Sequence, residues 1–363
     1  MKQYRVGIVG CGRMGGTIDD EVTQEDQWWQ YRPVSHAAAY QAVEETTLTA
    51  LADSDARKLE HFAQRYNIPD GHCYTDFRQM IDHEAPDIVS VTTPAGGHAP
   101  ITVYAAQHGV SGIFCEKAMA CSMDEADAML EACRANNVAF NLGTSRRYHP
   151  GMRTMREVIR SGRIGAPDLL VHKGWLGLLL HSGSHTFDTM LYLLGDPELK
   201  SVQGQLRSQT HKDGTVSAPR YDPEANRFLG QDAFESDPGI DFVTVLFKGG
   251  VRAHLVRLQP CYEFEVFGSE GSVGFNHYNK GWIRPSIKDG AIERMPFPEF
   301  RPESFTKCMI RDLIESIEAG SLGHLEASHR GMEVSMALAQ SHIEGRRLVE
   351  IPMTNRSLCV PNY

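Results

Sequence analysis

A glycine-rich loop near the start of the chain has the residue types and spacing of a dinucleotide-binding site. The apolar run Val6-Gly7-Ile8-Val9 leads directly into Gly10-Cys11-Gly12-Arg13-Met14-Gly15, a G-x-G-x-x-G sequence. In such a loop the first glycine permits a tight turn, the second lets the backbone approach a pyrophosphate, and the third lets helix and strand pack closely. The phosphates would lie at a helix N-terminus, where unpaired N–H groups favour negative charge. The alternative is an ordinary glycine-rich turn.

An aspartate at a strand end indicates which dinucleotide this loop would bind. Asp53 closes the segment Leu48–Asp53, much later than the spacing of about 20 residues usual for the acidic ribose ligand. A carboxylate at this position would accept both ribose hydroxyls and repel a 2′-phosphate, which favours NAD over NADP. Arg13 and Arg57 could instead accommodate NADP. For Asp53 itself, the alternative is a solvated aspartate without a ligand.

A lysine follows a strand at the edge where open α/β sheets bind ligands. Glu116-Lys117 comes at the carboxyl end of an expected strand over 112–116. An ammonium group there would stabilise negative charge that develops on a substrate oxygen. An ordinary surface Glu-Lys pair is the alternative.

Two histidines and an aspartate lie close together in His181-Ser182-Gly183-Ser184-His185-Thr186-Phe187-Asp188. On a helix, residues 181, 185 and 188 share one face. Histidine suits proton transfer because its ordinary pKa is about 6.5. His-x-x-x-His can also bind zinc, but no third ligand follows at a clear spacing, and we expect no metal. A pair of hydrogen-bonded structural histidines is the remaining alternative.

The first 145 residues alternate apolar strands with helical patterns. This alternation predicts a doubly wound parallel sheet of the Rossmann type, with helices on both faces. The segment 17–36, with Trp28 and Trp29, interrupts the pattern and is interpreted as an insertion: a lid, a subunit contact or a locally packed loop. Strands are expected at 4–9, 47–52, 87–92, 112–116 and 138–142, and helices at 55–66, 98–108 and 123–136.

Residues 146–363 are expected to form a second, α+β domain for substrate binding and oligomerisation, with an open, mainly antiparallel sheet and last residues that could pack back on the N-terminal domain. Turns such as Lys248-Gly249-Gly250 separate closely spaced extended segments, as in antiparallel sheets. Residues 208–240, rich in Asp, Pro, Gly and Ser, are expected to form a long surface excursion. Strands are expected at 168–176, 198–207, 241–248, 251–258, 262–268 and 272–277, and helices at 150–161, 184–194, 303–319 and 326–345.

Composition excludes several other classes of protein. The 363 residues are enough for about two domains. A net charge of −10 argues against a nucleic-acid-binding surface. No apolar run reaches the roughly 18 residues of a membrane helix, and the N-terminus does not have a signal-peptide pattern. The eight cysteines form no C-x-x-C pair and are expected to be reduced thiols of a cytoplasmic protein.

Across nearly its whole length the chain resembles the glucose–fructose oxidoreductase and inositol dehydrogenase (Gfo/Idh/MocA) family. The resemblance rests on the order and spacing of short motifs: the glycine loop at 10–15, Thr93-Pro94 with His98, Glu116-Lys117, Arg146-Arg147-Tyr148-His149-Pro150 and Gly183–Asp188. Two positions depart from the family pattern. Ala118 replaces the proline of Glu-Lys-Pro, and His181 replaces the aspartate of Asp-x-x-x-His.

The resemblance implies roles for individual residues. Lys117 and His185 would be the catalytic lysine and the catalytic acid/base, with His181 tuning or relaying the proton. Asp188 would orient the ring of His185 or cap local structure. The expected cofactor-binding residues are Gly10, Gly12, Arg13, Met14, Gly15, Asp53, Thr93, Pro94, His98 and Glu116. The expected substrate-binding residues are Lys117, Arg147, Tyr148, His149, Lys173, His181, His185 and Asp188.

The expected activity is NAD-dependent interconversion of a secondary hydroxyl and a ketone on a sugar, cyclitol or derivative. An acidic substrate is a further hypothesis, because His181 removes a negative charge beside Lys117, Arg147 and Lys173. Two alternatives remain open: a glycosidase that oxidises its sugar transiently at C3, and a non-catalytic NAD-binding sensor. The family also implies a homodimer or homotetramer formed through the open sheet of the second domain.

Overall fold

The computed structural model describes residues 2–22, 31–207, 237–259, 261–276, 280–285, 290–294 and 303–361, with the backbone of four short strands between 209 and 228. Those strands form two small ladders, β9 (Gln209–Thr210) with β10 (Val216–Ser217) and β11 (Tyr221–Asp222) with β12 (Arg227–Phe228). Trp28 and Trp29 lie outside the described residues, as does most of the expected excursion at 208–240.

The N-terminal part contains the predicted parallel sheet, with six strands in the order β3-β2-β1-β4-β5-β6. The chain runs outward from β1 to β3 and then crosses back to β4 on the other side of β1. This reversal puts a ligand-binding crevice at the carboxyl ends of β1 and β4 in folds of this class. The strands are β1 (Tyr4–Val9), β2 (Thr46–Ala52), β3 (Cys73–Tyr74), β4 (Ile88–Val91), β5 (Gly112–Cys115) and β6 (Ala139–Leu142).

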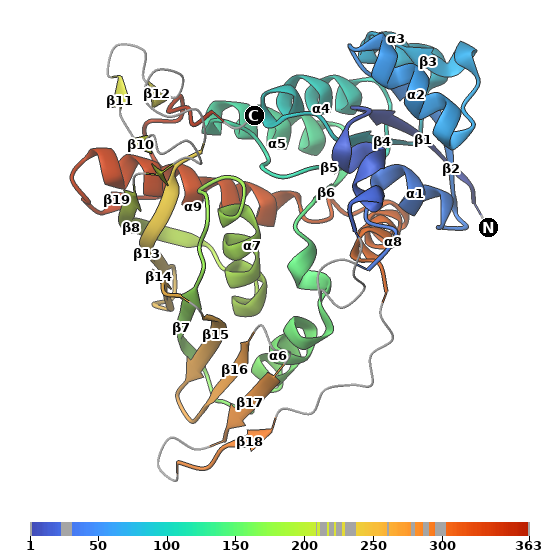
Figure 1. Ribbon diagram of the computed structural model, residues 1–363. Helices are drawn as coiled ribbons and strands as arrows, with labels where there is room; N and C mark the ends of the chain where they lie inside the picture. The colour runs from blue at the N-terminus through green and yellow to red at the C-terminus, as the bar shows by residue number, and fades with distance from the viewer. Residues whose placement is uncertain are drawn as a thin grey trace.

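Helices cover both faces of this sheet (Figure 1). On one face, α3 (Phe77–Glu84), α4 (His98–Gln107) and α5 (Met123–Ala135) bury apolar residues such as Met80 and Ile101 against the strands. On the other face lie α1 (His36–Gln41), α2 (Ala56–Tyr66) and α8 (Phe305–Glu318). The helix α8 comes from far along the chain, so the second half of the protein completes the core of the first.

The second sheet has nine strands in the order β18-β17-β16-β15-β7-β14-β13-β8-β19. Neighbouring strands are antiparallel except β7 and β14, which are parallel. The expected open, mainly antiparallel sheet is therefore confirmed. Its strands are β7 (Pro167–Gly174), β8 (Leu199–Arg207), β13 (Gly239–Phe247), β14 (Arg252–Arg257), β15 (Tyr262–Gly268), β16 (Ser272–Asn276), β17 (Lys280–Arg284), β18 (Glu293–Arg294) and β19 (Val349–Glu350).

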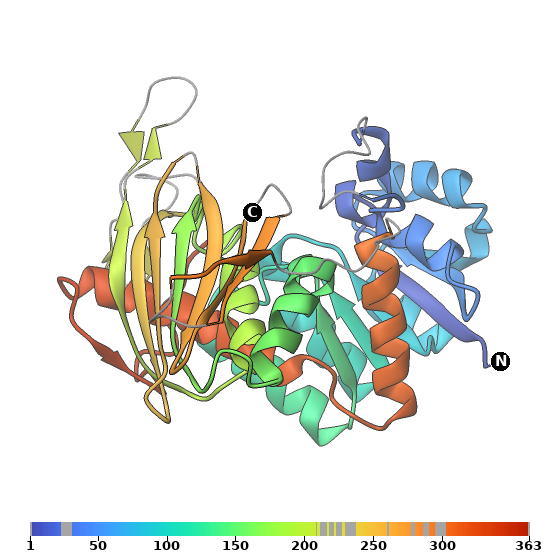
Figure 2. The same ribbon diagram turned by 90° about the horizontal axis from the view of Figure 1, so that it is seen from below.

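Three helices connect the two sheets. Figure 2 shows α6 (Pro150–Arg160) and α7 (Gly183–Leu194) between the second sheet and the N-terminal part. The helix α9 (Leu325–Ile343) packs on β8 and α7 and also reaches α5 and β6. The last described residues return to the N-terminal part, where the Val360 N–H donates to the Cys121 carbonyl at 2.9 Å. None of the described helices is long and apolar enough to cross a membrane.

Candidate functional site

The glycine loop has the geometry that a dinucleotide phosphate needs. Gly10 has φ +107°, and a Cβ there would lie 2.7 Å from the Thr92 carbonyl carbon. A Cβ on Gly15 would lie 2.3 Å from the Gly10 oxygen, whereas a Cβ on Gly12 would meet nothing within 4 Å. Two glycines are therefore required by packing, and the middle one leaves open space where a pyrophosphate could approach the backbone. The residues present fit a dinucleotide.

The helix expected after this loop is interrupted. Arg13–Thr17 form a π-helical turn that includes the half-buried Met14, Ile18–Asp20 form a 3₁₀ turn, and α1 begins only at His36. Asp19 closes the insertion at its base, since its carboxylate accepts from the N–H of Val34 at 2.8 Å and of Ser35 at 3.0 Å. The insertion thus separates the glycine loop from α1 without displacing α1 from the sheet.

Asp53 lies beside the glycine loop, directly after β2. One carboxylate oxygen accepts from the Cys11 N–H at 2.7 Å, and the other accepts from the Asp55 N–H at 2.9 Å. These bonds fix the carboxylate where a ribose could reach its remaining lone pairs. The two arginines that could favour NADP both have acidic partners: Arg13 pairs with Glu21 at 2.9 Å, and Arg57 lies 3.8 Å from Asp55.

Lys117 lies after β5 and is held by a chain of buried polar groups. Its ammonium is 3.9 Å from Glu116, whose second oxygen lies 3.1 Å from Nε2 of His36. The other ring nitrogen of His36 lies 2.6 Å from the hydroxyl of Ser90, and its ring stacks on Phe114. Burial raises the pKa of Glu116, but the His36 hydrogen bond and the Lys117 charge outweigh it and lower that pKa to about 2. Glu116 is therefore a permanent anion that fixes the lysine.

His98 supports the same turn from the other side and does not face a ligand. It is fully buried, with ring nitrogens 2.7 Å from the Ala118 carbonyl and 2.8 Å from the Thr93 carbonyl. Burial lowers its pKa. The expectation that His98 binds the cofactor is corrected: it ties the Thr93-Pro94 segment to the turn after Lys117. The peptide bond between Lys117 and Ala118 is cis.

His185 lies in the first turns of α7, close enough to Lys117 for the lysine charge to affect its pKa. Burial, then the positive charges of Arg146 and Lys117, hold the pKa of His185 well below its usual value. Nδ1 is buried without a hydrogen-bond partner among the described residues. At neutral pH the ring is uncharged and can therefore accept a proton.

His181 does not share a helical face with His185, because α7 begins at Gly183 and His181 lies in the preceding turn. His181 is exposed, although part of its ring is shielded from water. This partial burial and then the positive charge of Lys117 lower its pKa. The turn is held by Asp237, which accepts from the N–H groups of Leu180 at 2.8 Å and His181 at 2.6 Å. Asp237 is buried, and burial raises its pKa to about 7.

The structure corrects the expectation that Arg147 and Asp188 bind substrate. Their side chains are 4% and 6% exposed and form an ion pair, with the Arg147 Nε 3.0 Å from Asp188. A second Arg147 nitrogen lies 3.0 Å from Nδ1 of His324, whose Nε2 lies 2.7 Å from Asp312. The pair therefore joins α7 to the network that connects α8 and α9.

Three other expected substrate residues also face protein partners. The Tyr148 hydroxyl donates to Asp312 at 2.8 Å, and His149 is buried and accepts from the Gly151 N–H at the start of α6. Lys173 pairs with Glu263 at 2.7 Å. On β7, Lys173 points to the face opposite that of the fully buried His172, because side chains alternate along a strand.

Sequence reasoning missed several residues that the structure brings to this region, and two of them are immediate neighbours of predicted ones. Arg146, the neighbour of Arg147, lies close enough to His185 to affect its pKa, and His172, the neighbour of Lys173, is the buried residue of that strand. The run Leu169-Leu170-Val171 is apolar on both faces, so its pattern could not set the strand's parity. His36 and Asp237 fell within an insertion and an excursion that gave no signal of their own.

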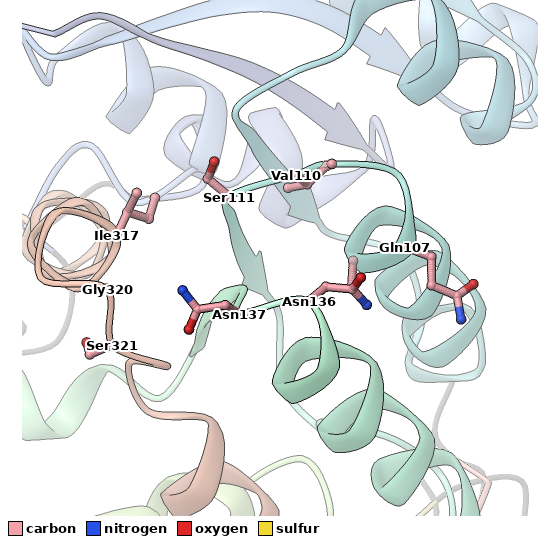
Figure 3. Close-up of a pocket in the computed structure, with 10 residues that line it drawn as sticks. Gln107, Val110, Ser111, Asn136, Asn137, Ile317, Gly320 and Ser321 are labelled. Carbon is pink, nitrogen blue, oxygen red and sulfur yellow. The ribbon is translucent and has the colours of Figure 1, made fainter.

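A separate pocket of about 440 Å³ lies at the opposite edge of the parallel sheet, near the start of β5 (Figure 3). It is lined by Gln107, Ser111, Asn136, Asn137, Ile317 and Ser321, among others, and contains no titratable side chain. It therefore lacks the groups for proton transfer. Among the described residues, no cluster of three or more His, Cys, Asp or Glu could hold a metal ion.

Comparisons with known proteins agree with this geometry. Residues 4–144 match the Gfo/Idh/MocA oxidoreductase family, described as having an NAD-binding Rossmann fold. Inositol 2-dehydrogenase 4 of Saccharopolyspora erythraea is 26% identical over 341 residues, covering 90% of this chain and 88% of that protein. Myo-inositol 2-dehydrogenase of Thermotoga maritima is 23% identical and covers 74% of each chain.

The whole fold is also shared with solved structures. Levoglucosan dehydrogenase, solved with NADH and levoglucosan, has a TM-score of 0.72 at 19% identity and covers 97% of this chain and 100% of its own. The aldose-aldose oxidoreductase of Caulobacter crescentus has a TM-score of 0.70 at 21% identity, covering 96% of this chain and all of its own. The expected NAD cofactor is confirmed for the family, whose characterised relatives are enzymes. Residues 4–144 therefore match the family of Gfo/Idh/MocA oxidoreductases with an NAD-binding Rossmann fold, and the six-stranded parallel sheet described above lies within this matched segment.

Proposed function

We propose that this protein is an NAD-dependent oxidoreductase that interconverts a secondary hydroxyl and a ketone on a sugar, cyclitol or derivative. The observation that carries the proposal is that His185 is uncharged and lies close enough to Lys117 for the lysine charge to lower its pKa. Lys117 itself lies at the carboxyl edge of the sheet that bears the glycine loop. A base and a cation together can remove a hydroxyl proton and stabilise the oxygen left behind.

The chain's own residues divide the work. His185 accepts the proton of the substrate hydroxyl, and the Lys117 ammonium stabilises the oxygen as negative charge develops. Glu116 and His36 hold Lys117 in place. Gly10, Gly12 and Gly15 would hold the phosphates of NAD and Asp53 a ribose, with Thr93 and Pro94 at the adjacent strand end. When bound, NAD supplies the hydride acceptor.

The proposal is tested with a panel of sugars, cyclitols and their glycosides, assayed with NAD and with NADP. Formation of NADH in proportion to the oxidised substrate is expected. Release of an aglycone without accumulation of NADH would indicate the redox-neutral glycosidase instead. Binding of NAD without any change in the cofactor or in the panel compounds would indicate a sensor.

We also propose that two copies associate through the open face of the second sheet. The helices α7 and α9 pack on the other face, where His172 and Val243 are buried. On the open face, Val256 is 43% exposed and pairs across the strands with the half-buried Phe242. Exposed apolar side chains on a broad sheet are typical of an interface. A homodimer or a tetramer built from such dimers would cover them.

A further inference from the structure

Arg146 differs from the arginines around it because no carboxylate among the described residues neutralises it. Its Nη1 donates to the hydroxyl of Thr186 at 3.0 Å, and its guanidinium lies 5.0 Å from the centre of the Tyr262 ring. Arg147 and Arg156 each pair with an acid, but within the described part of the chain Arg146 has no acidic oxygen within 4.0 Å. Arg146 is also only half-buried, so a ligand can reach it.

Arg146 acts electrostatically on two nearby histidines. It lowers the pKa of His185 and also that of His172, whose pKa falls to about 3 mainly through burial. His172 is fully buried, with its ring 4.9 Å from the Tyr262 ring. Lys117 adds a second cation to the neighbourhood of His185.

The nearby acids are committed to other partners. Glu116 is bound to His36 and Lys117, and Asp237 accepts backbone N–H groups at the start of α7. Glu263 pairs with Lys173 on the opposite face of β7. The charge of Glu116 offsets that of Lys117, so Arg146 is left as the cation near His185 that has no acidic partner among the described residues.

We propose that the substrate itself supplies this counter-ion: it carries a carboxylate that Arg146 binds, so the compound oxidised is a sugar acid or a related polyhydroxy acid. The planar guanidinium presents parallel N–H donors that match two carboxylate oxygens. Tyr262 and Thr186 fix its orientation, which lowers the entropy lost on binding. The inference rests on the proposed function and names its substrate class.

The carboxylate would also assist proton transfer. When His185 accepts the hydroxyl proton it becomes a cation, which Arg146 and Lys117 oppose and Glu116 favours, with Arg146 the largest of these charge effects. A bound carboxylate would offset this repulsion, because an opposite charge within about 4–6 Å favours the charged form of a group. From the sequence, the acidic substrate is expected to be bound near Arg147 and Lys173 as well as Lys117. Arg147 and Lys173 are both paired elsewhere, so Arg146 carries the argument.

The test measures binding to the NAD-loaded protein by calorimetry. Each acid is compared with its neutral counterpart: glucuronate with glucose, galacturonate with galactose, and gluconate with sorbitol, with glucose 6-phosphate as a separate arm. We expect at least one acid to bind about ten- to a hundredfold more tightly than its counterpart, the range for a hydrogen bond to a charged group. Arg146→Gln should remove that advantage, whereas Arg160→Gln, an exposed arginine at the end of α6, should preserve it.

The outcomes separate this inference from the proposed function. Neutral sugars that bind as tightly as their acids would overturn the inference and leave the proposed function standing. Equal losses for acid and neutral compounds in Arg146→Gln would also overturn it, since the residue would then act on folding or on the whole sugar. Glucose 6-phosphate binding most tightly would assign a phosphate instead of a carboxylate. If no compound binds while NAD does, both proposals fail.

Discussion

Replacing His36 with two different amides tests how the lysine is held. In glutamine, the amide nitrogen occupies roughly the position of the imidazole Nε2, so His36→Gln can still donate to Glu116. In asparagine, the amide group reaches only the position of Nδ1, so His36→Asn keeps a partner for Ser90 and loses the donor to Glu116. Both variants lose the stacking on Phe114, so the difference between them isolates the bond to Glu116.

The expected magnitude follows from the charge of Glu116. A hydrogen bond to a charged group contributes about 1.5–3 kcal/mol, and losing one partner leaves the buried acceptor unsatisfied. The pKa of Glu116 falls from an ordinary 4.5 to about 2 although burial raises it, and the His36 hydrogen bond is the largest of the contributions that lower it. We therefore expect His36→Asn to be less stable than His36→Gln by about 2 kcal/mol at neutral pH.

Urea unfolding at several pH values measures this difference. A carboxyl group whose pKa is lowered in the folded protein stabilises the fold at pH values above the ordinary pKa of that group. For Glu116 this stabilisation is lost as pH falls from about 4.5 toward 2. The gap between the wild type and His36→Asn should therefore narrow below pH of about 4. His61→Gln, on the exposed face of α2, should match the wild type throughout. Equal losses in the Asn and Gln variants would refute the reasoning, because packing alone would then explain the role of His36.

Four further substitutions have definite expected outcomes. Gly12→Ala should fold normally, since its Cβ meets nothing in the protein, but should bind NAD weakly because the Cβ fills the space left for the pyrophosphate. Gly15→Ala should lose about 1–3 kcal/mol of stability through its clash with Gly10. Calorimetry with NAD and urea unfolding distinguish the two variants. Asp237 has a raised pKa of about 7, so its contribution to stability falls as pH rises from about 4 to 7, and Asp237→Asn should gain on the wild type over that window in unfolding measurements. Val256→Lys should shift the protein toward monomer in light scattering without changing NAD binding, and an unchanged mass would contradict the proposed interface.

Much of the fold could be predicted from sequence because its signals are local. The G-x-G-x-x-G loop after an apolar strand gave the Rossmann sheet, and the crowded extended segments after 198 gave the second sheet. The return of α8 to the first sheet was not foreseen, since nothing in a helical pattern says which surface it will cover. The interruption at 17–36 was visible as an unusual spacing, but not the way Asp19 closes it.

The site was less predictable because adjacent residues point in different directions. Lys117 follows β5 and His185 lies in α7, and their catalytic roles stay a proposal. Arg147 is a buried partner of Asp188, while its neighbour Arg146 has no acidic partner in the described part of the chain. His98, expected at the cofactor, supports the turn after Lys117. Such distinctions depend on tertiary partners that a single sequence does not show. The domain boundary at 145/146 stays a prediction.

The most direct test of the account compares Lys117→Met with the wild type on the sugar, cyclitol and sugar-acid panel, following NADH formation and NAD binding together. The account predicts NADH in proportion to substrate oxidised by the wild type, loss of turnover in Lys117→Met, and unchanged affinity for NAD. Full turnover in Lys117→Met would contradict the role of the lysine. A wild type that binds NAD and reduces none of it with any of these compounds would contradict the proposed activity.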